Sequence, residues 1–147
     1  MHARIPPCLV VLTCLVAALP ASAQLTVATD KPEYIPGELV QITIHNAGPG
    51  VAVFSSEPPL AIWHLATGEC CHGCTGLPVI TTLAAGASRT FAFDPLGCPI
   101  GDPFGLYEVV VAGASPDPDP VLATTFTVLD VVGAERLAWG WLKGLYR

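Results

Sequence analysis

LVQITIHN (residues 39–46) has the clearest structural pattern in this chain. Hydrophobic and polar side chains alternate along it, with Val40, Ile42 and Ile44 separated by Gln41, Thr43 and His45. Because successive side chains of a β-strand point to opposite faces, this alternation predicts a strand with one buried face and one exposed face.

Further segments on either side have the same character and a similar short length. They are LTVAT (25–29), VAVF (51–54), LAIWHL (60–65), PVITTL (78–83), SRTFAF (88–93), LYEVVVA (106–112) and VLATTFTV (121–128). Turn-forming glycine, proline and aspartate separate them, and no segment between residues 24 and 130 has a helical period. The pattern predicts an all-β fold, an immunoglobulin-like antiparallel two-sheet sandwich of seven to eight strands. The acidic SPDPDP run (115–120) is predicted to be a surface loop before the last strand.

The first 23 residues, MHARIPPCLVVLTCLVAALPASA, have the three parts of a secretory signal peptide. Arg4 supplies the positive charge, residues 8–19 the hydrophobic stretch, and residues 21–23 the small side chains before a cleavage site. The hydrophobic stretch is shorter than the roughly 20 residues that a transmembrane helix needs. We therefore expect an exported protein (periplasm, cell surface or extracellular) that is cleaved after Ala23, with no transmembrane segment in its mature chain. A lipoprotein acylated at Cys14 is the alternative, although Thr13 fits poorly before such a cysteine.

The chain is expected to divide into three parts: a signal peptide (1–23), the immunoglobulin-like sandwich (24–129) and a C-terminal tail (130–147). The formal net charge is −6, and between residues 30 and 130 the only basic side chains are Lys31 and Arg89. An acidic body repels phosphate backbones, so we expect no binding to nucleic acid.

Several segments resemble known immunoglobulin-like families. TDKPEYIPGELVQITIHN (29–46) is similar to the opening of macroglobulin-type domains, in which a Tyr-x-x-Gly-Glu motif, here Tyr34, Gly37 and Glu38, leads into a strand that ends in Asn. VAVFSSEPPLAIWHLATGE, TLAAGASRTFAFD and GLYEVVVAG resemble the BsuPI proteinase-inhibitor family. Together the resemblances cover about residues 29–113 and imply turn roles for Gly37 and Gly86 and core positions for Trp63 and Tyr107. They leave out the cysteine cluster, and no set of inhibitory residues can be carried over.

ECCHGC (69–74) holds three of the four cysteines of the predicted mature chain, and the fourth is Cys98. An even number of cysteines in an exported chain is typical of disulfides, and a bond between the neighbours Cys70 and Cys71 would be strained. Two pairings remain, in which Cys98 joins either Cys70 or Cys71 and Cys74 joins the other. A bond from the cluster to Cys98 would close a loop of about 27 residues and stabilise the fold by roughly 3 to 4 kcal/mol.

Metal binding is an alternative for the same side chains. Thiolates and an imidazole could surround Zn²⁺ or Cu(I), with ligands from Cys70, Cys71, His72, Cys74 and Cys98. Redox activity of Cys71 and Cys74 as a C-x-x-C pair is a further alternative, although such pairs usually open a helix in a βαβ fold. We expect no cofactor, because Thr75 stands where c-type haem attachment would need a histidine.

The remaining polar side chains do not form a recognisable catalytic set. His45 and His64 lie on predicted strands whose faces the sequence does not relate to each other, so either is more readily a surface or hydrogen-bonded residue than a ligand. The carboxylates of residues 30, 33, 38 and 57 are too dispersed for the six to eight oxygens of a calcium site. No Gly-x-Ser-x-Gly motif occurs. We therefore expect no catalytic residues and no enzyme activity.

The tail AERLAWGWLKGLYR (134–147) differs from the body in composition. Leu137, Trp141 and Leu145 recur every four residues, which allows a short amphipathic helix that Gly140 and Gly144 would weaken by about 1 kcal/mol each. The tail is expected either to pack on the sandwich or to act as a sorting or anchoring signal, with a weak membrane contact. Its ending resembles the Trp-Gly-x-x-Lys-x-x-Tyr-Arg endings of exported bacterial proteins, and the residues concerned are Trp139, Trp141, Lys143, Tyr146 and Arg147.

These observations favour an exported, non-catalytic binding or structural module that contacts another protein of the cell envelope or outside the cell. The sequence does not identify that partner. The first alternative is a secreted protease inhibitor, which depends on the BsuPI resemblance. The second is a metal-binding envelope protein that uses the Cys/His cluster.

Overall fold

The computed structural model of the chain describes residues 22–115 and 121–130. These residues form strands and one 3-10 turn, η1 (Pro95–Gly97). The strands are β1 (Leu25–Thr29), β2 (Glu33–Tyr34), β3 (Val40–Asn46), β4 (Ala52–Phe54), β5 (Leu60–His64), β6 (Glu69–His72), β7 (Thr81–Leu83), β8 (Ser88–Phe93), β9 (Gly105–Val111), β10 (Ala114–Ser115) and β11 (Ala123–Val128). The predicted all-β class is confirmed.

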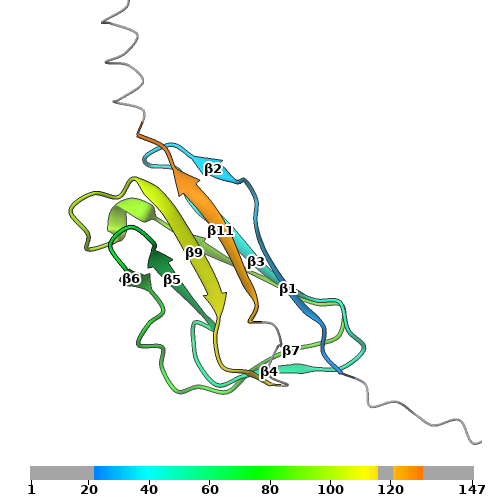
Figure 1. Ribbon diagram of the computed structural model, residues 1–147. Coiled ribbons are helices and arrows are strands. Elements are labelled where there is room, and N and C mark those ends of the chain that lie inside the picture. Colours follow the sequence, from blue (N-terminus) through cyan, green and yellow to red (C-terminus); the bar gives the residue numbers. More distant parts are fainter. Residues whose placement is uncertain (1–21, 116–120, 131–147) are drawn as a thin grey trace, which may run out of the picture.

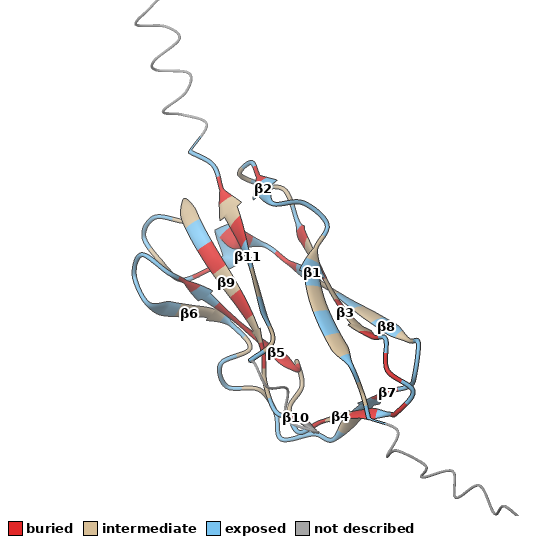
Figure 2. Cartoon of the chain, turned by 45° about the vertical axis from the view of Figure 1, so that its right-hand side comes forward, coloured by how far each residue is buried: buried red, intermediate tan, exposed pale blue. Residues whose placement is uncertain are grey.

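Two sheets face each other and form the sandwich (Figures 1 and 2). One has the order β1-β3-β8, and the other has the order β2-β11-β9-β5-β6. A short third sheet, β10-β4-β7, lies at the end of the sandwich opposite β2. All strand pairs of the described residues are antiparallel except β2 with β11. The two larger sheets therefore enclose one core.

The core consists mainly of residues whose side chains these two sheets turn toward each other, with further residues from β4, β7 and β10; the buried positions are coloured red along the chain in Figure 2. In β3 the predicted alternation is confirmed, because Val40, Ile42 and Ile44 are buried and the residues between them are partly exposed. Aromatic rings fill the centre: Tyr107 and Phe126 are stacked with centroids 5.0 Å apart, and Phe93 meets both edge-on. Burial of these rings supplies a large share of the hydrophobic stabilisation.

Tyr107 also forms the corner hydrogen bond that is typical of immunoglobulin-like sandwiches. Its hydroxyl donates to the carbonyl oxygen of Pro103, four residues upstream, at 2.7 Å. Burial, with the negative charge of Asp102 nearby, raises the pKa of Tyr107 to about 12. The hydroxyl thus stays protonated and fixes the loop before β9.

The Tyr-x-x-Gly-Glu motif organises the loop between β1 and β3. Tyr34 is buried and donates its hydroxyl to Asp30 at 2.6 Å, while Glu38 pairs with Lys31 at 2.8 Å and accepts the Ile35 N–H. Gly37 and, in the turn before β8, Gly86 have φ of +86° and +71°, a region that favours glycine. Both glycines therefore occupy turns.

All eight predicted strands occur in the structure, and three short strands, β2, β6 and β10, were missed. β2 and β10 have two residues each, too few for a period to be visible. The prediction of Trp63 as a core residue was wrong, because it is 37% exposed. Its neighbours Ile62 and His64 face the core, so the alternation of β5 turns Trp63 outward.

Candidate functional site

The cysteine cluster begins as a strand rather than as an irregular loop. β6 pairs with β5 at the edge of the five-stranded sheet, and Cys70 lies opposite Trp63. Residues opposite each other on neighbouring strands share a face, so Cys70 lies with Trp63 on the side of the sheet that points away from the core. Cys71, the next residue, points to the other side and packs against the core.

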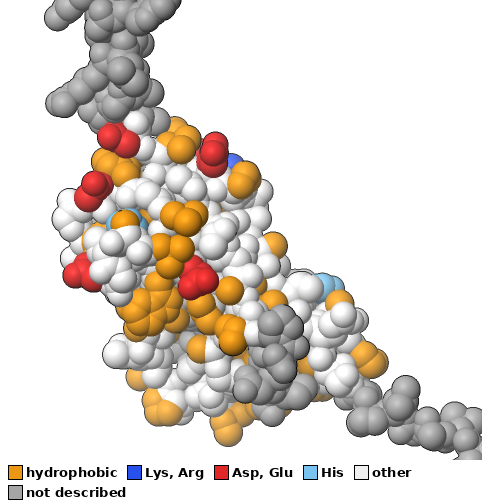
Figure 3. Space-filling model, in the orientation of Figure 1, with side chains coloured by type: hydrophobic (Ala, Val, Ile, Leu, Met, Phe, Trp, Pro, Cys, Tyr) orange, Lys and Arg blue, Asp and Glu red, His pale blue; other side chains and the backbone are white. Residues whose placement is uncertain are grey.

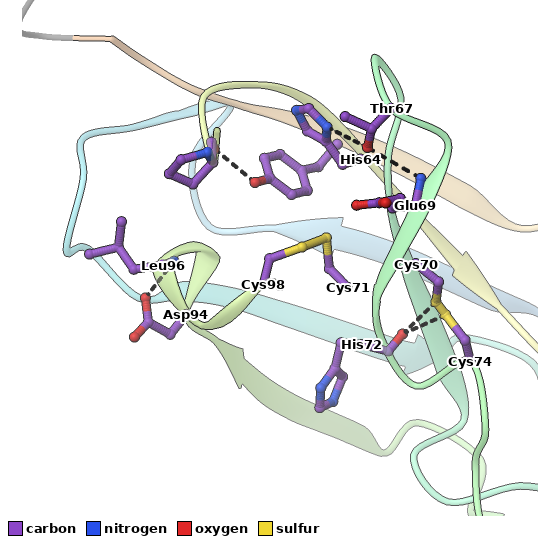
Figure 4. The surroundings of a disulfide bond; sticks show 12 residues. His64, Thr67, Glu69, Cys70, Cys71, His72, Cys74, Asp94, Leu96 and Cys98 are labelled. Carbon is purple, nitrogen blue, oxygen red and sulfur yellow. Dashed lines mark hydrogen bonds between the residues drawn. A yellow bond between two sulfur atoms is a disulfide. The ribbon is translucent and has the colours of Figure 1, made fainter. Parts of the chain in front are cut away.

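The position of Cys71 against the core makes it the cysteine of the cluster that reaches Cys98. Cys71 and Cys98 form a disulfide with Cα atoms 4.7 Å apart, and Cys70 and Cys74 form a second one with Cα atoms 6.2 Å apart (Figure 4). Cys98 directly follows η1 and is almost fully buried. The inner disulfide therefore ties the edge strand β6 to the segment between β8 and β9.

The metal-binding and C-x-x-C alternatives both need free thiolates, but all four cysteine sulfurs are bonded in these two disulfides. Cys71 and Cys74 belong to different disulfides, so they do not form a redox pair with each other. The His72 ring is turned away from the sulfur atoms in Figure 4 and lies 6.1 Å from the Phe93 ring. Within residues 22–115 and 121–130, no group of three or more His, Cys, Asp or Glu side chains is placed to hold a metal ion.

The strand histidines lie on different faces and do not converge. His45 is on the side of β3 that points away from the core, where its Nδ1 lies 2.9 Å from Ser88 Oγ. His64 is buried, with Nδ1 3.0 Å from Thr67 Oγ1 and Nε2 3.0 Å from the Phe104 carbonyl oxygen. Both ring nitrogens of His64 thus have partners, which suits a structural role.

Three of the four carboxylates considered for calcium have partners within the fold. The hydrogen bond from Tyr34 holds the pKa of Asp30 below its usual range, and the one from Lys31 does the same for Glu38. Glu57 forms a two-pronged ion pair with Arg89, with oxygen–nitrogen distances of 2.9 and 2.5 Å. These three carboxylates therefore stabilise loops and strand ends.

The outer face of the five-stranded sheet carries a hydrophobic surface that the sequence analysis missed. Trp63, Leu65 and Leu106 are 37%, 44% and 44% exposed. Val110 is paired with Ala61 and Ala123 on the same face. Figure 3 shows hydrophobic side chains gathered over β5 and β9, and we call this surface the outer face.

Glu108 lies in the middle of the outer face. It is paired with Trp63 on one side and Thr125 on the other, and it is half-buried. Among the described residues, no ion pair or hydrogen bond reaches its carboxylate. The outer face is therefore hydrophobic, with one negative charge near its centre that no described residue compensates.

The alternation of GLYEVVV (105–111) contains the signal that could have revealed this surface. Tyr107, Val109 and Val111 are the buried series, so Leu106, Glu108 and Val110 are the outward series. Two hydrophobic residues in an outward series are unusual for a solvated strand.

Three predicted segments lie wholly or mostly outside the described residues. They are most of the signal peptide, the acidic loop after Ser115 (116–120), and the tail from residue 131 on, with Trp139, Trp141, Lys143, Tyr146 and Arg147. The part of the chain that the structure describes contains no helix long and hydrophobic enough to cross a membrane.

Comparison with known proteins gives only distant structural likenesses. No protein-family model matches the chain, and no curated protein sequence matches it significantly. A β-glucosidase from Erythrobacter marinus matches 74% of this chain with 14% identity and a TM-score of 0.44, and one from Listeria innocua matches 74% with 17% identity and a TM-score of 0.41. The chain spans 16% of each of these enzymes. Spo0M, a sporulation control protein from Bacillus subtilis, matches 76% of this chain with 18% identity and a TM-score of 0.31, over 49% of its own length.

Proposed function

We propose that this protein is an exported, non-catalytic binding module that holds another protein on the outer face. The observation that carries the proposal is the hydrophobic surface around Trp63, Leu106 and Glu108. Contiguous exposed hydrophobic surface costs solubility and commonly marks a site of protein contact. The signal-peptide pattern of the sequence supports a partner outside the cytoplasm.

The chemistry of the outer face defines the partner's complementary surface. Trp63 is a large, partly exposed aromatic side chain, the type that most often contributes strongly to binding. Glu108 would lose water in a complex, and an unpaired buried charge is strongly unfavourable. The partner is therefore expected to present hydrophobic side chains around an arginine or lysine.

A second copy of this chain fits the same surface poorly. In a two-fold symmetric pair, a residue near the centre of the face meets its own copy. Glu108 would then approach another Glu108, and two like charges that meet in an interface weaken the binding free energy by roughly several kcal/mol. We therefore propose a different protein as the partner.

Site-specific photo-crosslinking in the producing cells tests the proposal. A photoreactive amino acid at Leu106 is expected to give one discrete protein adduct. The matched control is the same amino acid at Thr90, which is exposed on the outer side of β8 in the other sheet. Adducts of the same kind at both positions, or none at Leu106, would count against the outer face.

Protease inhibition is a second candidate, and one observation favours it. Leu77, Val79 and Ile80 are 66%, 44% and 77% exposed, in a segment that enters the short strand β7. Two backbone hydrogen bonds of 3.0 Å between Glu57 and Leu77 anchor its start. An exposed hydrophobic segment held at its ends is suited to a protease cleft.

A panel of secreted serine and cysteine proteases tests this second candidate. Inhibition at micromolar protein that Ile80→Asp abolishes, and that Glu108→Gln leaves unchanged, would support it. A panel left fully active would remove it.

A further inference from the structure

Of the two disulfides in the described residues, only Cys70–Cys74 has a fully exposed cysteine. Cys70 and Cys71 are both half-buried, but Cys74 is exposed, whereas Cys98 is 6% exposed and Cys71 packs against the core. Thiol–disulfide exchange starts when a thiolate attacks one sulfur of the bond, so access decides which bond reacts. External thiols therefore meet the Cys70–Cys74 bond first.

The attachment of β6 to the sheet does not depend on the Cys70–Cys74 bond. β6 pairs with β5 from Ile62 to His64, and the inner disulfide from Cys71 to Cys98 joins it to the segment after η1. If the Cys70–Cys74 bond opens, these two attachments remain. The bond can therefore be broken while the sandwich stays folded.

The surroundings of Cys70 and Cys74 suit the reduced pair as well as the disulfide. The carbonyl oxygen of His72 lies 3.5 Å from Cys70 Sγ and 3.3 Å from Cys74 Sγ (Figure 4). A disulfide sulfur has no proton to donate, but each S–H of the reduced pair would find this acceptor in place.

The turn between the two cysteines also keeps them close together. Gly73 has φ of +74°, and a Cβ at this position would overlap the carbonyl oxygen of Leu60. The turn is therefore packed tightly on the start of β5. Packing of this kind holds the two sulfurs within reach of each other, so that the bond can form again.

We propose that Cys70–Cys74 is a thiol–disulfide exchange site, which a dithiol reductant opens while Cys71–Cys98 stays intact. One thiolate of the dithiol attacks Cys74 Sγ, a mixed disulfide forms, and Cys70 leaves as a thiolate that takes up a proton. The second thiol of the reductant, as its thiolate, then attacks the mixed disulfide and releases Cys74, which is protonated in turn. Two electrons pass to the protein, and the dithiol leaves as a disulfide.

The exchange changes the outer face at the residue beside Trp63. Cys70 and Trp63 are cross-strand neighbours, so opening the bond replaces a closed five-residue ring with two thiols at the edge of that face. The exchange site itself does not depend on whether the outer face binds a partner.

Native redox titration of the whole mature chain tests the proposal. The protein is equilibrated in mixtures of reduced and oxidised dithiothreitol, quenched with iodoacetamide and mapped by peptide mass. Cys70 and Cys74 are expected to be labelled together at a reduced-to-oxidised ratio at least about tenfold lower than Cys71 and Cys98. The selectively labelled protein is expected to keep a cooperative thermal transition.

Two variants assign the labelled pair. Cys70→Ser/Cys74→Ser is expected to show no labelling at the low ratios of reduced to oxidised dithiothreitol that open the first bond. Cys71→Ala/Cys98→Ala is expected to keep its labelling at those ratios. Opening of both bonds at one ratio, earlier opening of Cys71–Cys98, or loss of the folded state on selective labelling would overturn the proposal. Because this titration uses no partner, its result is separate from the crosslinking at Leu106.

Discussion

At the residue scale, Asn46 joins the chain segments that meet at the end of β3. Its side chain is fully buried and donates from Nδ2 to the carbonyl oxygens of Gly50 at 2.7 Å and Leu83 at 3.0 Å. Its Oδ1 accepts the backbone N–H groups of Gln24 and Gly48, both at 3.2 Å. One side chain therefore connects the start of β1, the turn after β3 and the end of β7.

Asn46→Ala is expected to lower the free energy of unfolding by about 3 kcal/mol, because it leaves several buried backbone groups without partners. Urea unfolding measures the change. Thr43→Ala on the outer side of the same strand is the control, with an expected change within about 0.5 kcal/mol. Equal effects of the two substitutions would contradict the role of Asn46.

The Tyr34–Asp30 hydrogen bond makes stability depend on pH at both ends of the scale. Asp30 has a lowered pKa in the folded state, so its contribution is present above the unfolded value of about 3.9 and is lost as the pH falls. Burial and the bond to Asp30 raise the pKa of Tyr34 to about 12, so its contribution is present below about pH 10 and is lost toward pH 12.

Tyr34→Phe is therefore expected to lose less stability than the wild type both between pH 5 and pH 3 and between pH 10 and pH 12. Urea unfolding across these ranges is the measurement. Tyr107→Phe is the matched control: its phenol also has a pKa of about 12, but Asp30 keeps its bond, so only the alkaline slope should change. An unchanged acid slope in Tyr34→Phe would contradict the account of Asp30.

At the scale of elements, β6 is the strand that shows why the sequence pattern predicts some strands and misses others. The eight predicted strands were predictable because each lies in a segment of alternating or hydrophobic residues bounded by turn-forming residues. β6 contains Glu, two Cys and His, in which no hydrophobic alternation is visible. β6 is a strand because it pairs with β5. The sequence alone does not show which segments pair with each other.

The same missing contact explains why the disulfide pairing and Trp63 could not be placed from the sequence. Cys70 lies opposite Trp63, and Cys71 lies at the register shift of the β5–β6 pair, where it packs against the core and meets Cys98. The run LAIWH is hydrophobic on both faces, so it does not reveal which face is buried. Only packing against the other sheet selects Leu60 and Ile62 as core residues and leaves Trp63 outside.

The two disulfides are expected to differ in their contribution to stability. Cys71–Cys98 closes a loop with a sequence separation of 27, and Cys70–Cys74 one of 4. Loop-closure entropy gives about 3 to 4 kcal/mol for the first bond and about 2 kcal/mol for the second. Urea unfolding of Cys71→Ala/Cys98→Ala and Cys70→Ala/Cys74→Ala compares them, and a larger loss in the second variant would contradict the assignment of the inner bond as the main anchor.

At the scale of the whole molecule, the expected cleavage after Ala23 would leave every strand of the sandwich intact and remove one small side chain, that of Ala23, that packs against the core. Gln24 bonds to Asn46 through its N–H and to the Ala47 N–H through its carbonyl oxygen, at 3.2 and 2.8 Å, and β1 begins at the next residue. Of the described residues before Gln24, Ser22 accepts one hydrogen bond, from Gly50 at 3.3 Å. Intact mass of protein recovered from a secreting host is expected to show a chain that starts at Gln24, and a start within β1 would contradict this prediction.

The outer face combines exposed hydrophobic side chains with the carboxylate of Glu108, which has no ion-pair partner within residues 22–115 and 121–130. The most direct test is the affinity of the partner identified by crosslinking for the wild type and for two charge variants. Glu108→Arg is expected to weaken binding at least about tenfold, or about 1.4 kcal/mol, because it places a like charge against the partner's cation. Thr90→Arg, on the other sheet, is expected to leave the affinity unchanged. Equal affinities of Glu108→Arg and the wild type, or a loss confined to Thr90→Arg, would contradict binding through the outer face.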